Sequence, residues 1–209
     1  MPGPLHGYRI LDLTTVISGP FATMLLADQG ADVIKVEGVT RPDHARGAGH
    51  GENKFTATFL NNNRNKRSLA LDLKSDEGRE ILLKLAATAD IFIQNFRPGV
   101  VERLGIGEEE VRKVKEDIIY VSISGFGEKG PWTHKPVYDP IVQAISGLTT
   151  IQGGSDEERP RLVRTIVPDK LTGMTTAQAV TTALLHKERT GEGQHVRVSM
   201  LDAVISFLW

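Results

Sequence analysis

The sequence predicts an α/β fold, a Rossmann-like open parallel sheet flanked by helices. Short runs of strand-forming apolar residues alternate along the chain with longer helical runs, which is the pattern of repeated βαβ units. Turn residues separate these runs. A chain of 209 residues with 40% hydrophobic content can bury the core of one globular domain. We therefore expect residues 1–209 to form a single domain.

The first expected βαβ unit lies at the amino-terminal end. Residues 9–13 are predicted to form a strand and residues 18–20 a turn, in which Pro20 can take the first position of a helix. That helix is predicted over residues 21–29, and residues 32–36 are predicted to form the second strand. The unit therefore has two strands joined by a helical crossover.

The same pattern continues through the rest of the chain. Residues 68–73 are predicted to form a strand, and Ser75 caps the helix that follows. Residues 91–93 and 118–123 give two further strands, and a long helix begins near Asp169. Strands separated by helices imply a parallel sheet, whose ligands bind beyond the carboxyl ends of the strands. We therefore look for the site in the loops that follow the strands.

Composition excludes several classes of protein. Lysine and arginine number 25 against 26 aspartates and glutamates, so no excess of positive charge favours nucleic acid. The chain contains no cysteine, which excludes disulfides, thiolate catalysis and cysteine-ligated metal. It has no long uncharged apolar run and no signal-like start, so we expect a cytoplasmic protein without a membrane segment.

The histidines do not predict a metal site. They are dispersed and lack the spacing of two ligands on one helix face. The chain has six of them: His6, His44, His50, His134, His186 and His195. The acidic runs at 108–110 and 156–158 are predicted to be solvated charges at a helix start and in a loop. We therefore expect no bound metal.

Polar loops follow the predicted strands. The loop 14–20 offers backbone N–H groups at a helix start, and the loop 94–99 places Phe96 beside an amide and an arginine. Residues 61–67 are the densest cluster of basic and amide side chains, and residues 124–132 contain three glycines. Each loop alone is equally a surface turn. Together they suit a ligand with phosphates and a base, such as coenzyme A.

Asp169 stands between Pro168 and a long helical run rich in alanine, threonine and leucine. We expect Asp169 at the N-cap of this helix, where backbone N–H groups and the helix dipole favour its ionised form. An ionised carboxylate in that position can act as a cap or as a nucleophile. Position alone leaves both roles open.

Six segments in a fixed order carry a family resemblance. They are ILDLTTVISGPFATMLLADQGADVIKVE (10–37), NRNKRSLALDLK (63–74), ADIFIQNFRPGVVERLGI (89–106), YVSISGFGEKGP (120–131), YDPIVQAISGL (138–148) and HKERTGEGQHVRVSMLDAV (186–204), with Asp169 before the last. Through them the chain resembles the amino-terminal part of the family III CoA-transferases, the group that includes formyl-CoA transferase and carnitine CoA-transferase. Each segment alone is weak evidence for the family, whereas the ordered set of segments is specific to it.

The resemblance implies roles for particular residues. Asp169 matches the nucleophilic aspartate of the family, and Tyr138 matches a residue close to the thioester. Contacts with coenzyme A are implied for Val16, Ile17, Ser18, Leu71, Asp72, Leu73, Lys74, Asn95, Phe96, Arg97, Arg103, Lys135 and Tyr138. The family often has an arginine soon after the second strand. Here residues 38–40 intervene, which leaves Arg41 as the candidate substitute.

The implied activity is transfer of CoA between an acyl-CoA and a carboxylic acid, without a prosthetic group. Asp169 would attack the thioester to give a mixed anhydride, and the CoA thiolate would then form an aspartyl-CoA thioester. Backbone N–H groups of residues 125–127 are candidates for stabilising the oxyanions. The acceptor acid reverses these steps.

Two alternatives stay open. The 2-methylacyl-CoA racemases resemble the transferases but pair the aspartate with a histidine, where this chain has Tyr138 before Asp139 and only His134 nearby. The chain also ends on a bare apolar segment, 204–209, so we expect the truncated large domain of an interlocked homodimer. The second alternative is therefore a non-catalytic CoA-binding fragment.

Overall fold

A six-stranded parallel sheet forms the centre of the protein. The computed structural model describes residues 2–49, 51–53 and 55–209. Within them the strands of this sheet are β1 (Arg9–Asp12), β2 (Asp32–Gly38), β5 (Lys66–Leu71), β6 (Ile91–Gln94), β7 (Ile119–Ser124) and β8 (His195–Ser199). Their order across the sheet is β5-β2-β1-β6-β7-β8. Two short strands, β3 (Gly51–Glu52) and β4 (Phe55–Thr56), pair separately as an antiparallel hairpin.

This strand order is that of the doubly wound Rossmann fold. The chain builds outward from β1 to β2 and β5, then returns to the other side of β1 with β6, β7 and β8. The direction of winding reverses between β1 and β6, and ligands of such sheets bind in the crevice at that point. The predicted fold class is therefore confirmed, and the topology locates the crevice at the carboxyl ends of β1 and β6.

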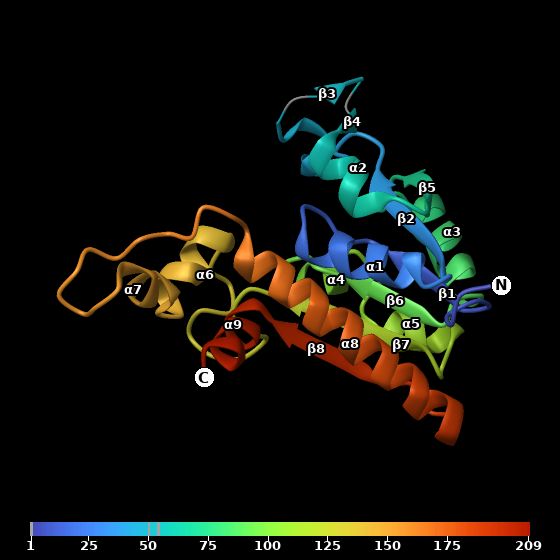
Figure 1. Cartoon of the computed structure of the whole chain (residues 1–209). Coiled ribbons are helices and arrows are strands. Elements are labelled where there is room, and N and C mark those ends of the chain that lie inside the picture. Colours follow the sequence, from blue (N-terminus) through green and yellow to red (C-terminus); the bar gives the residue numbers. More distant parts are fainter. Residues whose placement is uncertain (1, 50, 54) are drawn as a thin grey trace.

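Helices cover both faces of the sheet. Helices α1 (Ser18–Asp28) and α8 (Val167–Thr190) pack together on one face over the side chains of Ile10, Ile91 and Val121. Figure 1 shows α8 running across the sheet beside α1. The opposite face carries α3 (Asp76–Ala86), α4 (Val100–Arg103) and α5 (Glu108–Val114), which contribute to the core around Leu11, Phe92 and Tyr120. Alternate side chains along the buried strands thus belong to two cores.

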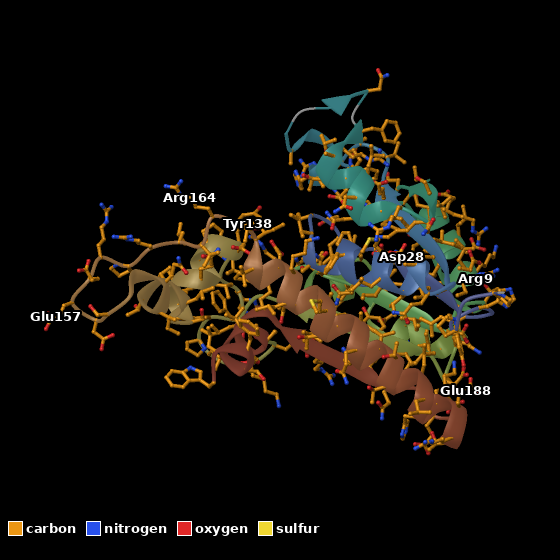
Figure 2. All side chains as sticks on the ribbon, in the orientation of Figure 1. Arg9, Asp28, Tyr138, Glu157, Arg164 and Glu188 are labelled. Carbon is orange, nitrogen blue, oxygen red and sulfur yellow. The ribbon has the colours of Figure 1, made fainter. Side chains whose placement is uncertain are left out.

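The remaining helices lie around the edges of this sandwich. They are η1 (His44–Gly47), α2 (Ala57–Asn63), α6 (Asp139–Ile145), α7 (Leu148–Gly153) and α9 (Met200–Leu208). Helices α6 and α7 form a projection that extends away from the sheet (Figure 1). Figure 2 labels Tyr138, Glu157 and Arg164 on that projection and Glu188 near the far end of α8. No helix of the described residues is both long and apolar enough to cross a membrane.

The prediction that the basic residues 61–67 form a loop at the ligand-binding edge is wrong. Its first residues finish α2 and its last residues begin β5, at the amino end of that strand rather than at the ligand-binding edge. Its cations are already paired, since Arg64 bonds Asp28 and Arg67 bonds Asp32. Lys66 is paired with the buried Asp12. The cluster therefore holds the edge strand in place and does not supply charge to the site.

Candidate active site

A pocket of about 280 Å³ lies at the carboxyl ends of β1, β6 and β7. Eight residues predicted for the site line it: Val16, Ser18, Asn95, Phe96, Arg97, Lys135, Tyr138 and Asp169. They come from the loops after β1 and β6, the segment before α6 and the start of α8. The loops converge because the ends of neighbouring parallel strands meet at one edge of the sheet.

Asp169 lies in the first turn of α8 rather than at its cap. The helix begins at Val167, three residues earlier than expected, and Ile166 is the N-cap residue. Pro168 causes the earlier start, since proline has no N–H to satisfy and its fixed φ suits a first turn. The N–H of Asp169 is one of the free donors of that turn. It donates to Asp139 Oδ2 at 3.2 Å.

A glycine brings this turn close to α1. A Cβ built on Gly173 would lie 2.7 Å from the carbonyl oxygen of Ser18 and 2.8 Å from the ring of Phe21. Both distances are shorter than real Cβ contacts, so only glycine allows α8 to approach α1 this closely. Ser18 is the first residue of α1 and shares the pocket with Asp169. The close helix crossing therefore positions the carboxylate over the start of α1.

The carboxyl group of Asp169 is held in an unfavourable environment for charge. Burial raises its pKa to about 6, and the carboxylate of Asp139 adds to the increase. Hydrogen bonding from Ser18 and the charge of Lys170 oppose the shift without cancelling it. The expectation that the helix start favours the ionised form is therefore wrong in its net effect, because burial and a like charge outweigh the favourable contacts.

Asp139 is the neighbour that sequence reasoning missed. It is 3% exposed and stands at the start of α6. Its Oδ1 accepts a hydrogen bond from Gln143 Nε2 at 2.6 Å, while Oδ2 faces the N–H of Asp169. The sequence shows Asp139 directly after Tyr138, and the signal could have been found from the proline that follows, which marks a helix start.

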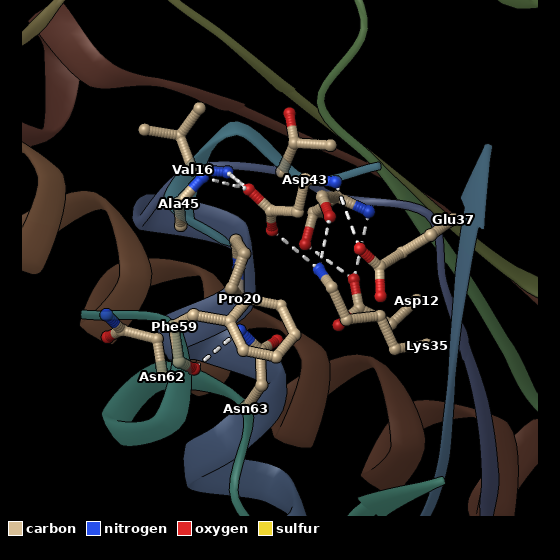
Figure 3. A network of polar contacts seen from close by, with 12 residues as sticks. Asp12, Val16, Pro20, Lys35, Glu37, Asp43, Ala45, Phe59, Asn62 and Asn63 are labelled. Carbon is tan, nitrogen blue, oxygen red and sulfur yellow. Dashed lines mark hydrogen bonds and ion pairs between the residues drawn. The ribbon is translucent and has the colours of Figure 1, made fainter. Parts of the chain in front are cut away.

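The loop after β1 has a strained backbone. Val16 has φ of 72°, in the left-handed region that β-branched residues rarely adopt. Its N–H donates to Asp43 Oδ1 at 2.9 Å, and Asp43 Oδ2 accepts from Lys35 Nζ at 2.9 Å. Figure 3 shows this buried network beneath the loop. Lys35 also donates to the carbonyl oxygen of Thr14 at 2.8 Å. Asp43 thus holds the backbone of Val16 in this conformation through its hydrogen bond, and Lys35 holds Asp43 in place.

Asn95 closes the crevice between β1 and β6. Its Oδ1 accepts from the N–H of Thr15 and its Nδ2 donates to the carbonyl oxygen of Thr15, both at 2.9 Å. The two loops that flank the reversal of strand order are therefore tied to each other. Phe96 and Arg97 follow directly and line the pocket. The loop therefore borders the pocket, and its contact with coenzyme A stays a prediction.

Several predicted contacts lie away from this pocket. Among the described residues, its lining includes neither Ile17, nor the segment 71–74, nor Arg103. The segment 71–74 follows β5, which is separated from β1 by β2, a distance of about 10 Å at normal strand spacing. The side chain of Leu71 is buried in the core, whereas Lys74 and Arg103 are exposed. These roles stay predictions.

Two further expectations change. His134 does not line the pocket, whereas His44 at the start of η1 does. The N–H of Gly127 already donates to Ser124 Oγ at 3.1 Å, so of the predicted oxyanion donors Gly125 is the one that borders the pocket. His50 lies outside the described residues. The described residues contain no group of three or more acidic or histidine side chains that could hold a metal.

Comparisons with known proteins place the chain in a family. The family model of CoA-transferase family III matches residues 5–209. The chain is 41% identical to acetyl-CoA:oxalate CoA-transferase of Acetobacter aceti, over 99% of this chain and 53% of that protein. It is 42% identical to mouse succinyl-CoA:glutarate CoA-transferase, over 98% of this chain and 47% of that protein. The chain thus spans about half the length of the curated relatives it matches.

Solved structures agree with this assignment. The crystal structure of a CAIB/BAIF family protein from Brucella suis superposes with a TM-score of 0.92 at 34% identity, covering 100% of this chain and 56% of that one. Rv3272 of Mycobacterium tuberculosis gives a TM-score of 0.90 at 36% identity, over 99% of this chain and 57% of that one. The chain therefore belongs to CoA-transferase family III.

Proposed function

We propose that the chain transfers CoA between an acyl-CoA and a carboxylic acid, with Asp169 as the nucleophile. One observation carries the proposal. Asp169 lines the pocket at the topological switch of the sheet, and none of the ion pairs formed by the described residues involves it. A carboxylate without a cationic partner keeps its electron pair available for attack. Family membership supports the same activity.

The proposed reaction proceeds through two covalent intermediates. An Asp169 oxygen attacks the thioester carbonyl, the C–S bond breaks, and the products are a mixed anhydride and CoA thiolate. The thiolate then attacks the aspartyl carbonyl and releases the donor acid, leaving an aspartyl-CoA thioester. The acceptor acid repeats these steps in reverse. The free energy of the thioester is thereby conserved in the enzyme-bound intermediate.

The pocket suggests how the substrate lies. The thioester would sit between Asp169 and Tyr138, whose side chain is 64% exposed. The pantetheine arm would follow the Asn95–Arg97 loop and the backbone of residues 16–18. The adenosine end would extend across β2 toward residues 71–74, and Arg103 would meet a phosphate. This path uses the predicted contacts outside the pocket and all of those inside it except Lys135.

Dicarboxylic acids are the proposed acid substrates. Relatives at 41% and 42% identity are named for oxalate and glutarate transfer. Arg97 and Lys135 both line the Asp169 pocket and bring positive charge to it. A guanidinium or ammonium group can hold the second carboxylate of such an acid away from the reacting centre. A monocarboxylic acid would lack that contact.

A transfer assay tests the proposal. The chain is incubated with succinyl-CoA and glutarate, and glutaryl-CoA is measured by mass spectrometry. We expect transfer by the wild type and a loss of at least about 10³-fold in kcat/KM for Asp169→Asn. Acetate as acceptor provides the monocarboxylate control. CoA binding without transfer to any acid would instead support a CoA-binding module.

The racemase alternative now depends on a different histidine. His44 lines the same pocket as Asp169, so the two could form a proton-transfer pair. The test is exchange of deuterium from solvent into the α-carbon of a 2-methylacyl-CoA. Exchange without CoA transfer, lost in His44→Gln, would favour the racemase. We propose the transferase because the chain places Tyr138 before Asp139 in its motif.

The assembly and location of the protein are further parts of the proposal. We propose a homodimer that acts in the cytoplasm on soluble acyl-CoA and acids. Exposed apolar side chains on the α6–α7 projection and on α9 support association, among them Ile151, Leu162 and Phe207. Light scattering of the purified chain gives its mass in solution, and a monomer at assay concentrations would contradict the dimer.

A further inference from the structure

We propose that Ser122 is a second nucleophile, part of a Ser122–His195–Glu108 relay that hydrolyses small neutral acyl esters in a separate cavity. The cavity measures about 480 Å³ and lies between the Phe96–Pro98 loop, the start of α5 and the strands β7 and β8. Ser122, His195 and Glu108 all line it. Its other carboxylates, Glu102, Glu109, Glu110 and Glu128, exceed its two arginines, Arg97 and Arg197.

The three side chains form a continuous hydrogen-bonded relay. Ser122 Oγ lies 2.9 Å from His195 Nε2, and His195 Nδ1 bonds Glu108 Oε2. Gln94 Nε2 donates to Ser122 Oγ at 3.1 Å, which leaves the hydroxyl proton of Ser122 directed at the imidazole. Nε2 then accepts, and Nδ1–H donates to Glu108. This is the arrangement of nucleophile, base and orienting acid that activates a serine.

The fold fixes each member of the relay. Ser122 lies on β7 and is 6% exposed, and His195 begins the neighbouring strand β8. The ring of Tyr120 meets the imidazole edge to face at a centroid distance of 5.1 Å, which restrains its rotation. Glu108 starts α5 and is held by Arg112 at 2.8 Å. These elements are rigid, so the relay is set before any substrate arrives.

The protonation state suits a general base. Burial lowers the pKa of His195, while Glu108 and Glu128 oppose the shift and Arg197 adds to it. The imidazole is therefore neutral at physiological pH and can accept the proton of Ser122. Gln94 positions Ser122, because its Oε1 accepts from the N–H of Phe96 at 2.8 Å, which fixes the amide NH₂ toward Ser122 Oγ.

The relay is distinct from the Asp169 pocket. Ser122 does not line the first pocket and Asp169 does not line the second, as far as the described residues show. The two cavities are neighbours that share the loop after β6 and the end of β7, through Phe96, Arg97, Pro98, Ile123 and Ser124. The excess of carboxylates in the second cavity repels phosphates and anionic acyl chains. Neutral short-chain esters are therefore the class of substrate that fits.

The proposed reaction balances without a cofactor. Ser122 Oγ bonds the ester carbonyl carbon as its proton passes to His195 Nε2. The bond to the alcohol oxygen breaks, and that oxygen takes the proton from His195, giving an acyl-serine and a free alcohol. Water then attacks the acyl-serine as its proton passes to His195 Nε2, the bond between the acyl carbon and Ser122 Oγ breaks, and Oγ takes the proton back from His195. The products are the carboxylic acid and the original serine.

A fluorophosphonate probe tests the proposal directly. The chain is labelled, digested with trypsin and sequenced by mass spectrometry, which resolves Ser122 from Ser124 within the fragment 116–129. We expect a single adduct on Ser122, with labelling about 10²-fold slower in His195→Gln. Glu108→Gln, which changes a partly exposed side chain, should also slow it. The matched control, Ser68→Ala, changes an exposed serine on β5 and should label like the wild type.

Hydrolysis of p-nitrophenyl acetate gives the second readout. The rate should fall to background in Ser122→Ala and stay unchanged in Ser68→Ala, the exposed serine on β5. Circular dichroism confirms that each variant is folded. No adduct on Ser122 of the folded wild type, or equal labelling of Ser122 in folded His195→Gln, would overturn the proposal.

Discussion

Two pairs of carboxylates, buried or half-buried, have opposite surroundings in this protein. Asp12 and Asp43 lie under the loop after β1, where Lys66 and Lys35 each approach a carboxylate to 2.9 Å. Asp139 and Asp169 lie at the junction of α6 and α8. The described residues offer no cation in an ion pair with either of them. The first pair is neutralised by ion pairs, while the second has only the charge of the nearby Lys170 and hydrogen bonds from Ser18 to offset its negative charge.

The titration behaviour follows from this difference. Burial alone would raise the pKa of Asp12, but Lys66 and Lys35, with the hydroxyls of Thr14 and Thr23, lower it below its usual range. Burial raises the pKa of Asp169 to about 6, and the nearby Asp139 adds to the increase. A compensated carboxylate stabilises the fold, whereas an uncompensated one stores unfavourable energy that chemistry can use. We infer that the first pair is structural and the second functional.

Removing a cation from the first pair should have the largest effect. Lys35→Met leaves Asp43 buried without its partner, so we expect the free energy of unfolding to fall by about 3–5 kcal/mol. Urea denaturation measures the change. Lys129→Met alters an exposed lysine and should shift the free energy by less than about 0.5 kcal/mol. A loss below about 1 kcal/mol for Lys35→Met would show that this pair is not structural.

Removing a charge from the second pair should change the free energy of unfolding in the opposite direction, toward greater stability at neutral pH. Asp169→Asn takes away a carboxylate whose folded pKa of about 6 exceeds its ordinary value of 3.8. A raised pKa means that ionisation costs stability as the pH rises from about 4 to 6. We therefore compare the free energies of unfolding of Asp169→Asn and the wild type at the two pH values. The variant should be more stable relative to the wild type at pH 7 than at pH 4, by about 1–3 kcal/mol. Urea denaturation curves of both proteins at pH 4 and pH 7 measure this difference. A variant that loses stability relative to the wild type between pH 4 and pH 7 would refute the assignment.

The smallest expected effect is a shift in titration. Asp139→Asn removes the like charge beside Asp169, so the pKa of Asp169 should move down from about 6 toward its ordinary value. Carboxyl carbon NMR of aspartate-labelled protein follows the titration, with Asp169→Asn used to assign the resonance. Asp76→Asn, at an exposed position of α3 on the opposite face of the sheet, serves as the matched control. An unchanged titration in Asp139→Asn would mean that burial alone sets the pKa.

Much of the fold could be predicted because its signals are local. Strand runs, glycine and proline turns and the Ser75 cap depend on neighbouring residues, and Ser75 does accept from the N–H of Gly78 at 3.0 Å. The strand β8 and helix α2 gave weaker signals. The sequence His195–Ser199 alternates polar and apolar residues over only five positions, and α2 ends in three asparagines, which favour turns.

The site was harder to predict than the fold. The eight pocket residues came from ordered family motifs, and the structure brings them together. What sequence could not show is contact between distant segments. Asp139 acts on Asp169 from 30 positions away, and Ser122 meets His195 from 73 positions away. Neither spacing forms a motif, so the raised pKa and the serine relay follow only from tertiary packing.

Covalent capture of Asp169 tests the central claim most directly. The chain is mixed with a panel of acyl-CoAs, treated with hydroxylamine and digested with trypsin, which releases the short peptide 165–170. Asp169 supplies the only side-chain carboxylate of that peptide. Our account predicts an aspartyl hydroxamate at Asp169 that requires acyl-CoA and is absent without it. A peptide that stays unmodified with every donor, or modification at another residue in its place, would contradict the account.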